Sequence, residues 1–391
     1  MAHLDPDLDY EHWVTICVNA AVFELQETTA RFAHDKLREG VIDGIEYNAL
    51  ADIHKRVAEA IEAIHADQLN DYAAVLYQHW VEAEDIGKQV RYGLIAAQQM
   101  HDASQYVDEQ IMIGRLLRLN AHEFSDNPQK TLADLNHQMG RAHYGLSDYE
   151  DSKAYQKRAL ELYEALDDEQ GIADALALAG EVAFRQGDFD DAREPIMRSM
   201  ELYDKVGNRL RFATSHMNLG VLESQTGHPY KAKEAFRICY EIMQEIDDPL
   251  NLARSLNNYA IAHDLLGEKE RARELYEESL SLRREIKDRV GIAYSVYNLG
   301  SMHEEAGDND TAREHMLEAI QLLREVGEKM ALANGLSGLG DLERRQKNYK
   351  LSRQYQQEAL DIRKAIGVKN GENKSLQSMA LLARDIGDLD E

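Results

Sequence analysis

A forty-residue period runs through the second two-thirds of the chain and constrains its fold more than any other feature. A glycine or alanine recurs at this step, each time after a mostly apolar residue: Gly140, Gly180, Gly220, Ala260, Gly300, Gly340 and Ala380. Between these positions the apolar residues are spaced three and four apart, which is the spacing of an α-helix. Self-similarity at a fixed period of roughly 20–50 residues indicates a repeat array. We therefore expect each unit to be a pair of antiparallel helices.

Two further features keep the same step. A glycine–acid turn recurs as Gly187-Asp188, Gly267-Glu268, Gly307-Asp308 and Gly387-Asp388, with Ser147-Asp148 and Lys347-Asn348 as variants. Small residues fill two more columns, at Ser152, Ala192, Ala232, Ala272, Ala312 and Ser352 and at Ala159, Ser199, Cys239, Ser279, Ala319 and Ala359. Small side chains let two helices approach closely, and the turn joins a permissive glycine to a side chain that can cap the next helix.

These columns resemble the tetratricopeptide repeat (TPR) family. The resemblance covers residues 131–391 as six repeats and a C-terminal capping helix. It implies an all-α fold, a right-handed superhelical solenoid of antiparallel helix pairs. The usual unit has roughly 34 residues, so the longer step implies longer helices, and a HEAT-like array is the alternative on length alone. The small-residue columns and the glycine–acid turn favour the tetratricopeptide interpretation.

The composition suits one elongated array. Stacked repeats pack only on their neighbours, so 391 residues with 44% hydrophobic content need no single large core. The formal charge of −27 repels phosphate backbones, so we expect no direct nucleic-acid partner. The same charge leaves two interpretations open, a well-solvated surface or a basic protein partner.

Cysteine usage and the first apolar stretch bear on the compartment. Cys17 and Cys239 are far apart, and Cys239 stands in a small-residue column, so it is expected to be a packing residue rather than half of a disulfide. The stretch Trp13–Phe23 follows acidic residues and is too short to span a bilayer. We therefore expect a cytoplasmic protein without a membrane partner.

Residues 1–130 lack the period but keep helical spacing. Four helical segments are expected, at Asn48–His65, Asp71–Trp80, Ile86–Met100 and Tyr106–Asn120. Two segments, Arg31–Glu39 (RFAHDKLRE) and Ile53–Glu62 (IHKRVAEAIE), resemble signal-transducing ATPases of the STAND/AAA type, at the point where a winged-helix-like module ends and the sensor arm begins. The resemblance implies a winged-helix-like remnant followed by degenerate repeats. It also implies that His34 and Arg38 can contact a nucleotide-binding module of a longer parent protein; the alternative is a packed histidine and a solvated arginine.

Catalytic and metal-binding patterns are not apparent. No G-x-x-x-x-G-K-[ST] phosphate loop occurs, because Gly87-Lys88 lacks the upstream glycine and the hydroxyl residue. No H-E-x-x-H, C-x-x-C or G-x-S-x-G pattern is present. The histidines His143, His263 and His303 share one repeat column, where the tetratricopeptide family has an aromatic that wedges between helices, so we expect them to be packing residues. We expect no catalytic residues, metal or cofactor.

The binding signal is a row of asparagines, two residues before the glycine or alanine column. Asn218, Asn258 and Asn298 recur in three consecutive repeats, although asparagine is unfavourable inside helices. Each amide offers a donor and an acceptor, as one peptide unit requires. Neighbouring helices lie roughly 8–10 Å apart and an extended chain advances roughly 3.3 Å per residue, so one asparagine matches about every third ligand residue. The row resembles the asparagine ladder of peptide-binding tetratricopeptide proteins such as kinesin light chains, without their second asparagine.

Helical phase adds further candidates on the same helices, namely Arg254, Asn257, Tyr294, Tyr297, Met217 and Glu304. The alternative is that the ladder amides only join neighbouring helices. We expect a non-enzymatic scaffold that holds a protein or peptide segment in its concave groove, as the sensor or adaptor part of a bacterial signalling system. A peptide-pheromone receptor and the substrate-recruiting subunit of a separate protease, kinase or ATPase remain as alternatives.

Overall fold

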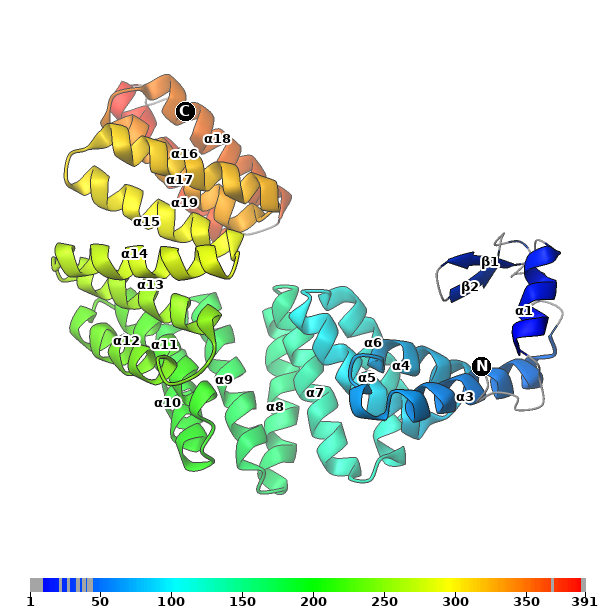
Figure 1. Ribbon diagram of the computed structural model, residues 1–391. Helices are drawn as coiled ribbons and strands as arrows, with labels where there is room; N and C mark the ends of the chain where they lie inside the picture. Colours follow the sequence, from blue (N-terminus) through cyan, green and yellow to red (C-terminus); the bar gives the residue numbers. More distant parts are fainter. Residues whose placement is uncertain are drawn as a thin grey trace. The chain divides into compact units, whose positions relative to one another are not determined.

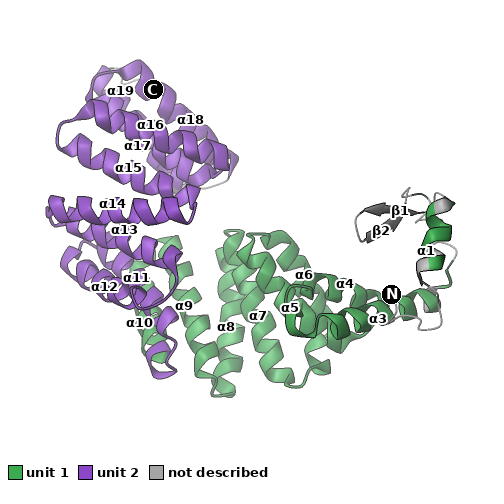
Figure 2. Ribbon diagram, viewed as in Figure 1, with its two compact units in different colours: residues 1–202 green, residues 203–391 purple. Residues whose placement is uncertain are grey.

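The computed structural model describes residues 10–20, 23–26, 29–32, 36, 40, 45–366 and 369–387. Within these ranges the chain is almost entirely helical, which confirms the all-α prediction (Figure 1). The chain divides into two compact units, residues 1–202 and residues 203–391 (Figure 2). None of the described helices is both long enough and apolar enough to cross a bilayer.

The elements of the first unit are α1 (Tyr10–Asn19), β1 (Phe23–Gln26), β2 (Thr29–Phe32), α3 (Tyr47–Ile64), α4 (Ala73–Glu82), α5 (Ile86–Asp102), α6 (Tyr106–Arg118), α7 (Pro128–Gly145), α8 (Tyr149–Ala165) and α9 (Glu169–Gln186), with short 3-10 turns at Ala66–Gln68 and Ala121–Phe124. Helix α10 (Phe189–Lys205) contains the division. The second unit holds α11 (Arg209–Gln225), α12 (Pro229–Met243), α13 (Pro249–Leu265), α14 (Lys269–Glu285), α15 (Arg289–Glu305), α16 (Asn309–Val326), α17 (Lys329–Arg345), α18 (Tyr349–Ala365) and α19 (Lys369–Ile386).

A short β-hairpin interrupts the N-terminal region, where we expected only helices. Strands β1 and β2 pair antiparallel, with Phe23 opposite Phe32. In the sequence, apolar residues alternate at Phe23 and Leu25, which is the two-residue period of a strand rather than the spacing of a helix. In the RFAHDKLRE segment, Phe32 therefore belongs to β2, while His34 and Arg38 lie outside the described residues.

Helices α3 to α6 appear where helical spacing predicted them. Their core is built on large side chains, among them Trp80, Tyr92 and Leu116, which are at most 2% exposed. Met139 of α7 belongs to the same core cluster. Burying an apolar side chain of this size contributes about 2 kcal/mol, so this packing fixes the N-terminal helices on the first repeat helix.

The small-residue columns mark the close contacts between paired helices. Every member of the two columns is buried, Cys239 among them. The glycine column has the same cause, because a Cβ added at Gly220 on α11 would lie only 2.5 Å from the Phe236 ring on α12. At Gly180 the corresponding neighbour is the Ile196 side chain, at 2.7 Å. The packing reason given for these columns is therefore confirmed.

The glycine–acid turns adopt the expected conformation but cap only in part. Gly187 and Gly307 have φ of +89° and +84°, in the left-handed region that glycine tolerates. Of the acidic residues that follow, Asp308 accepts a hydrogen bond from the Thr311 amide at 3.3 Å, whereas Glu268 makes no capping bond. The expected cap is therefore present at the Gly307-Asp308 turn and absent at the Gly267-Glu268 turn.

Caps are more regular at the other joint of the repeats, where the second helix of one pair leads into the first helix of the next. Side chains there accept a hydrogen bond from the backbone amide three residues on, at Asp168, Asn208, Asp248 and Asp288. These residues stand forty apart, a column that the sequence reasoning did not use. Each such cap contributes about 1 kcal/mol to its helix.

Candidate functional site

The three asparagines of the predicted ladder lie on the first helices of three successive pairs in the second unit. Asn218 is on α11, Asn258 on α13 and Asn298 on α15, and each is half-buried. Arg254 and Tyr294, one turn earlier on α13 and α15, are exposed. Equivalent positions of successive repeats share one side of the helix pairs, so we call these five residues the first-helix face.

Asn298 also connects two neighbouring helices. Its Nδ2 donates a hydrogen bond to Oδ1 of Asn257 on α13 at 3.0 Å, and Asn257 is only 8% exposed. A side-chain amide carries two N–H donors and one acceptor oxygen, so this bond occupies one N–H of Asn298. The alternative interpretation, in which the amides join neighbouring helices, is therefore correct for Asn257 and for one N–H of Asn298.

Two other candidates, Met217 and Tyr297, pack between helices rather than on the exposed side. Met217 is partly buried against a cluster that contains Phe236. The Tyr297 hydroxyl fills the space in front of Gly338, where a Cβ would collide with it. Burial raises the pKa of Tyr297, and the nearby carboxylate of Glu304 adds to the rise. Both side chains are therefore packing residues here rather than exposed ligand contacts.

Charged candidates differ in how they are engaged. Glu304 accepts a hydrogen bond from Nε of Arg345 on α17 at 2.7 Å, so the carboxylate expected to meet a basic ligand residue is paired within the protein. Arg254 is exposed, and its Nη1 lies 3.5 Å from Oδ1 of Asn251. An incoming acidic group would therefore meet Arg254 more readily than a basic group would meet Glu304.

Second helices contribute residues that the sequence reasoning missed. Arg363 at the end of α18 is 2% exposed, and its Nη2 donates to Oδ1 of Asn334 on α17 at 2.9 Å. Arg283 at the end of α14 is also buried and donates to the carbonyl of Gly291. Burial lowers the pKa of both guanidinium groups. The sequence signal for these residues was their repeat column, because Arg283 and Arg363 stand at multiples of forty residues after Tyr163 of the first unit.

The first unit has a polar cluster on α7 and α8. His137 Nδ1 lies 2.9 Å from Oε1 of Gln156, and Gln156 Nε2 donates back to the His137 carbonyl at 2.9 Å. The Tyr163 hydroxyl donates to Asp134 at 2.8 Å. Burial lowers the pKa of His137 to about 4, against the opposing effect of Asp174. At neutral pH this imidazole is therefore uncharged.

One group of potential metal ligands occurs in the described part of the chain, formed by His143, Asp148 and Asp151. His143 Nδ1 lies 3.1 Å from Asp148, the acidic residue of the following turn. The same link joins His263 to Glu268 in a later repeat, without a third ligand. The repeated link and the stacking of His143 on an aromatic neighbour indicate a structural role, as expected for this column.

The family profile described as "Tetratricopeptide repeat" matches residues 131–205, 211–285 and 291–365. No curated protein sequence matches the chain.

Similar solved structures share the fold at low sequence identity. The apo form of the quorum sensor NprR from B. thuringiensis is 12% identical, with a TM-score of 0.64, over 92% of this chain and 99% of that one. The Rap conjugation gene regulator of plasmid pLS20, in complex with the Phr* peptide, is 15% identical, with a TM-score of 0.61, over 85% and 94%. The STAND protein PH0952 from Pyrococcus horikoshii, with a tetratricopeptide repeat sensor, is 12% identical, with a TM-score of 0.64, over 99% of this chain and 57% of that one.

Proposed function

Because the chain belongs to the tetratricopeptide repeat family, we propose that it is a non-enzymatic scaffold that binds a protein or peptide segment in extended form. The first helices of such repeats line a concave groove, and the segment lies along the first-helix face. The observation that carries the proposal is the placement of Asn218, Asn258 and Asn298 at the repeat step, each half-buried. Each amide pairs with one peptide unit of the ligand.

Magnitudes limit what the asparagines contribute. Six backbone hydrogen bonds at about 1 kcal/mol each give less than the roughly 8 kcal/mol of a micromolar complex. Side-chain contacts must supply the difference. Arg254 and the exposed ring of Tyr294 flank the asparagines. They favour a ligand with an acidic group next to an apolar or aromatic one.

The similar structures support a peptide ligand. One relative of the same fold is described in complex with a peptide, and another is described as a quorum sensor. A short peptide signal is therefore the second candidate ligand beside a segment of a larger protein. A catalytic partner that uses this chain to recruit substrates is the third.

We further propose that residues 1–130 connect the repeat array at residues 131–391 to a signalling module that binds nucleotide. The chain corresponds to just over half of the STAND protein of the same fold, which supports the proposal. Ligand binding would then bias the arrangement of the helices that lead to that module. A truncated chain that begins after residue 70 should keep its ligand affinity and lose signalling; unaltered signalling would reject this coupling.

The ladder is tested by replacing all three asparagines with alanine. Peptides are first selected on the full chain from a displayed random library, and binding is then measured by calorimetry. Loss of six backbone hydrogen bonds at about 1 kcal/mol each corresponds to roughly 10,000-fold weaker binding, so a micromolar ligand should no longer bind measurably. The control replaces Gln244 and Gln321, two exposed amides on or beside the second helices, and should bind normally. Equal affinity of the triple variant and the wild type would eliminate the clamp.

The class of ligand is tested separately. Affinity capture of the full chain from cells, followed by mass spectrometry, distinguishes the three candidates. Recovery of a short peptide favours a receptor, and stable recovery of one catalytic protein favours a recruiting subunit. An enzymatic activity of the isolated chain would overturn the non-enzymatic assignment.

A further inference from the structure

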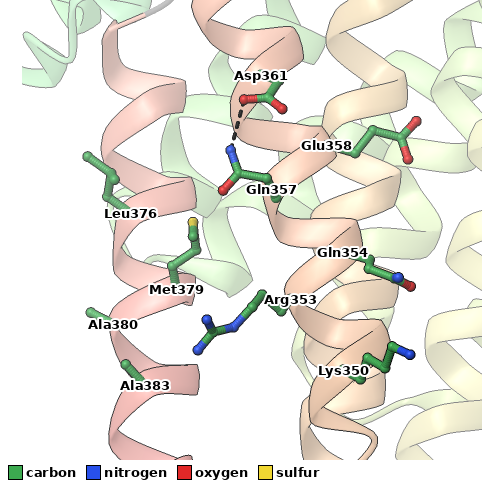
Figure 3. A pocket seen from close by; sticks show the side chains of 10 residues that line it. All are labelled: Lys350, Arg353, Gln354, Gln357, Glu358, Asp361, Leu376, Met379, Ala380 and Ala383. Atoms are coloured by element: carbon green, nitrogen blue, oxygen red, sulfur yellow. Dashed lines mark hydrogen bonds between the residues drawn. The ribbon is translucent and has the colours of Figure 1, made fainter. Parts of the chain in front are cut away.

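A groove of about 950 Å³ lies between the last two described helices, α18 and α19 (Figure 3). Apolar side chains line it from α19, and polar or charged side chains line it from α18. The lining residues are Leu376, Met379, Ala380 and Ala383 on α19 and Lys350, Arg353, Gln354, Gln357, Glu358 and Asp361 on α18. The groove lies apart from the first-helix face and its asparagines.

Earlier repeats show what such a surface normally contacts. In α17, Leu336 and Leu339 are buried, and both belong to the core cluster that includes Ala359 of α18. Their equivalents forty residues later are Leu376 and Met379 of α19. Leu376 is 51% exposed, whereas Leu336 is fully buried. In the described part of the chain, α19 thus presents a packing surface without the helix that covers it elsewhere.

The charges along α18 have an order that identifies the occupant. Two cationic residues, Lys350 and Arg353, come first, two glutamines follow, and two anionic residues, Glu358 and Asp361, come last. Reversing the direction of the helix exchanges cations for anions at every charged position. The spacing of these six residues is common to any helix face, but the other second helices do not carry this order of charges at the equivalent positions. It is complementary to a second α18 that runs in the opposite direction.

We propose that this face joins two copies of the chain about a two-fold axis. The axis runs between the two copies, level with the midpoint between Gln354 and Gln357 on α18 and with the midpoint between Met379 and Ala380 on α19. A two-fold interface is self-complementary, so each contact occurs twice. Its polar half pairs the following residues with those of the second copy: Lys350 with Asp361, Arg353 with Glu358 and Gln354 with Gln357.

The apolar residues of α19 also pair symmetrically about this axis. Leu376 meets Ala383 of the second copy, and Met379 meets its Ala380, so a large side chain faces a small one in both pairs. Because α18 and α19 run in opposite directions and line one groove, one axis serves both helices (Figure 3). The apolar residues supply the burial, and the charged residues set the direction of the pairing.

Net charge favours this face over the rest of the surface. The chain has 71 acidic and 44 basic residues, so two copies repel one another over most orientations. The groove has two cations, two anions and an uncharged half, which removes that repulsion locally. Glu358 already accepts a hydrogen bond from Arg324 at 2.6 Å, and Asp361 one from Gln357 at 2.8 Å. A carboxylate has about four acceptor sites, so each can take a second cation.

The first experiment reverses the charges in two complementary variants of the full chain. Analytical ultracentrifugation should find the wild type in a monomer–dimer equilibrium. Lys350→Glu with Arg353→Glu makes the α18 face wholly acidic, and Glu358→Lys with Asp361→Lys makes it wholly basic. Each variant alone should dimerise roughly 100-fold more weakly, because every attractive pair becomes repulsive. Mixed together, the two should form a heterodimer with at least the wild-type affinity.

The matched control reverses two exposed charges elsewhere in the second unit, Lys231→Glu and Arg273→Glu, for the same change in net charge. It should dimerise like the wild type. Circular dichroism confirms that every variant is folded. A wild type that is monomeric at all concentrations, an acidic-face variant that dimerises normally, or a mixture that does not associate would each overturn the proposal.

A second experiment reports the axis itself. With Cys17 replaced by serine, Ala380→Cys places two thiols next to the axis, and mild oxidation should give a disulfide-linked dimer. Leu381→Cys is the control, because Leu381 is exposed but does not line the groove. Crosslinking that is equally fast at both positions would overturn the proposed axis, even if the chain is dimeric by another surface.

Discussion

Replacing His137 with serine should flatten the dependence of stability on pH. The imidazole of His137 is half-buried, and desolvation lowers its pKa to about 4 from an ordinary value near 6.5. In the unfolded chain the same ring takes up a proton near pH 6.5. The unfolded state therefore binds more protons between these values, and the stability of the folded state falls as pH decreases through this window.

The size of the effect follows from the two pKa values. Relative to neutral pH, the wild type should lose about 2 kcal/mol at pH 5 through this residue, and about 3 kcal/mol once pH is below 4. Nearby Asp174 and Asp134 oppose the depression and Arg141 adds to it, so these charges are included in the value.

Serine is chosen because another repeat already uses it. Ser337 occupies the position of His137, and its hydroxyl donates to Oε1 of Gln356 at 2.8 Å. Gln356 returns a bond to the Ser337 carbonyl at 2.9 Å, as Gln156 does to His137. The substitution thus keeps the local bonding pattern and removes the group that titrates.

Urea unfolding followed by circular dichroism, at intervals from pH 7.5 to about 4.5, measures the difference. The substitution leaves a cavity and should lower stability at pH 7, but the gap between the two proteins should narrow by about 2 kcal/mol at pH 5. A second histidine variant, His315→Gln, provides a comparison. The ring nitrogen of His315 lies 2.9 Å from the Thr311 carbonyl oxygen. Parallel curves for wild type and His137→Ser would refute the reasoning.

Two further changes test the packing. Arg363→Met should raise the free energy of unfolding by about 1–3 kcal/mol, because the buried guanidinium has no acidic partner among the described residues. Methionine already occupies this repeat column at Met243, and a lower denaturation midpoint would contradict the prediction. Asp248→Ala should cost about 1 kcal/mol by removing the cap on α13, whereas Glu328→Ala, at an equivalent residue that makes no capping bond, should cost little. Equal losses in the two variants would reject the capping role.

Much of the fold follows from the sequence because its determinants are local. Helical spacing, the buried small-residue columns and left-handed turn residues such as Gly187 each act within one helix pair. The hairpin at β1 and β2 was missed because its signal is only a few residues long. The cap column that includes Asp248 is visible in the sequence, but residue type alone does not show whether the side chain reaches the amide three residues on, which Glu328 at the equivalent position does not.

The candidate site was harder to predict because it depends on contacts between helices. Helical phase placed Asn258 and Asn298 on one side, but not the bond from Asn298 to Asn257, which depends on how α13 and α15 pack. The same limit applies to Glu304 and Arg345, which stand forty-one residues apart and pair with each other. Both pairs join residues forty-one apart on successive first helices, but the sequence alone does not show which residues at that separation come into contact.

The caps at Asp168, Asn208, Asp248 and Asp288 make the joints between successive repeats interchangeable. Deleting the residues between any two of these caps removes whole repeats and rejoins the chain at a joint of the same kind. Duplication between the same points lengthens the protein without requiring a new connection. The length of the array can therefore be changed in steps of one whole helix pair.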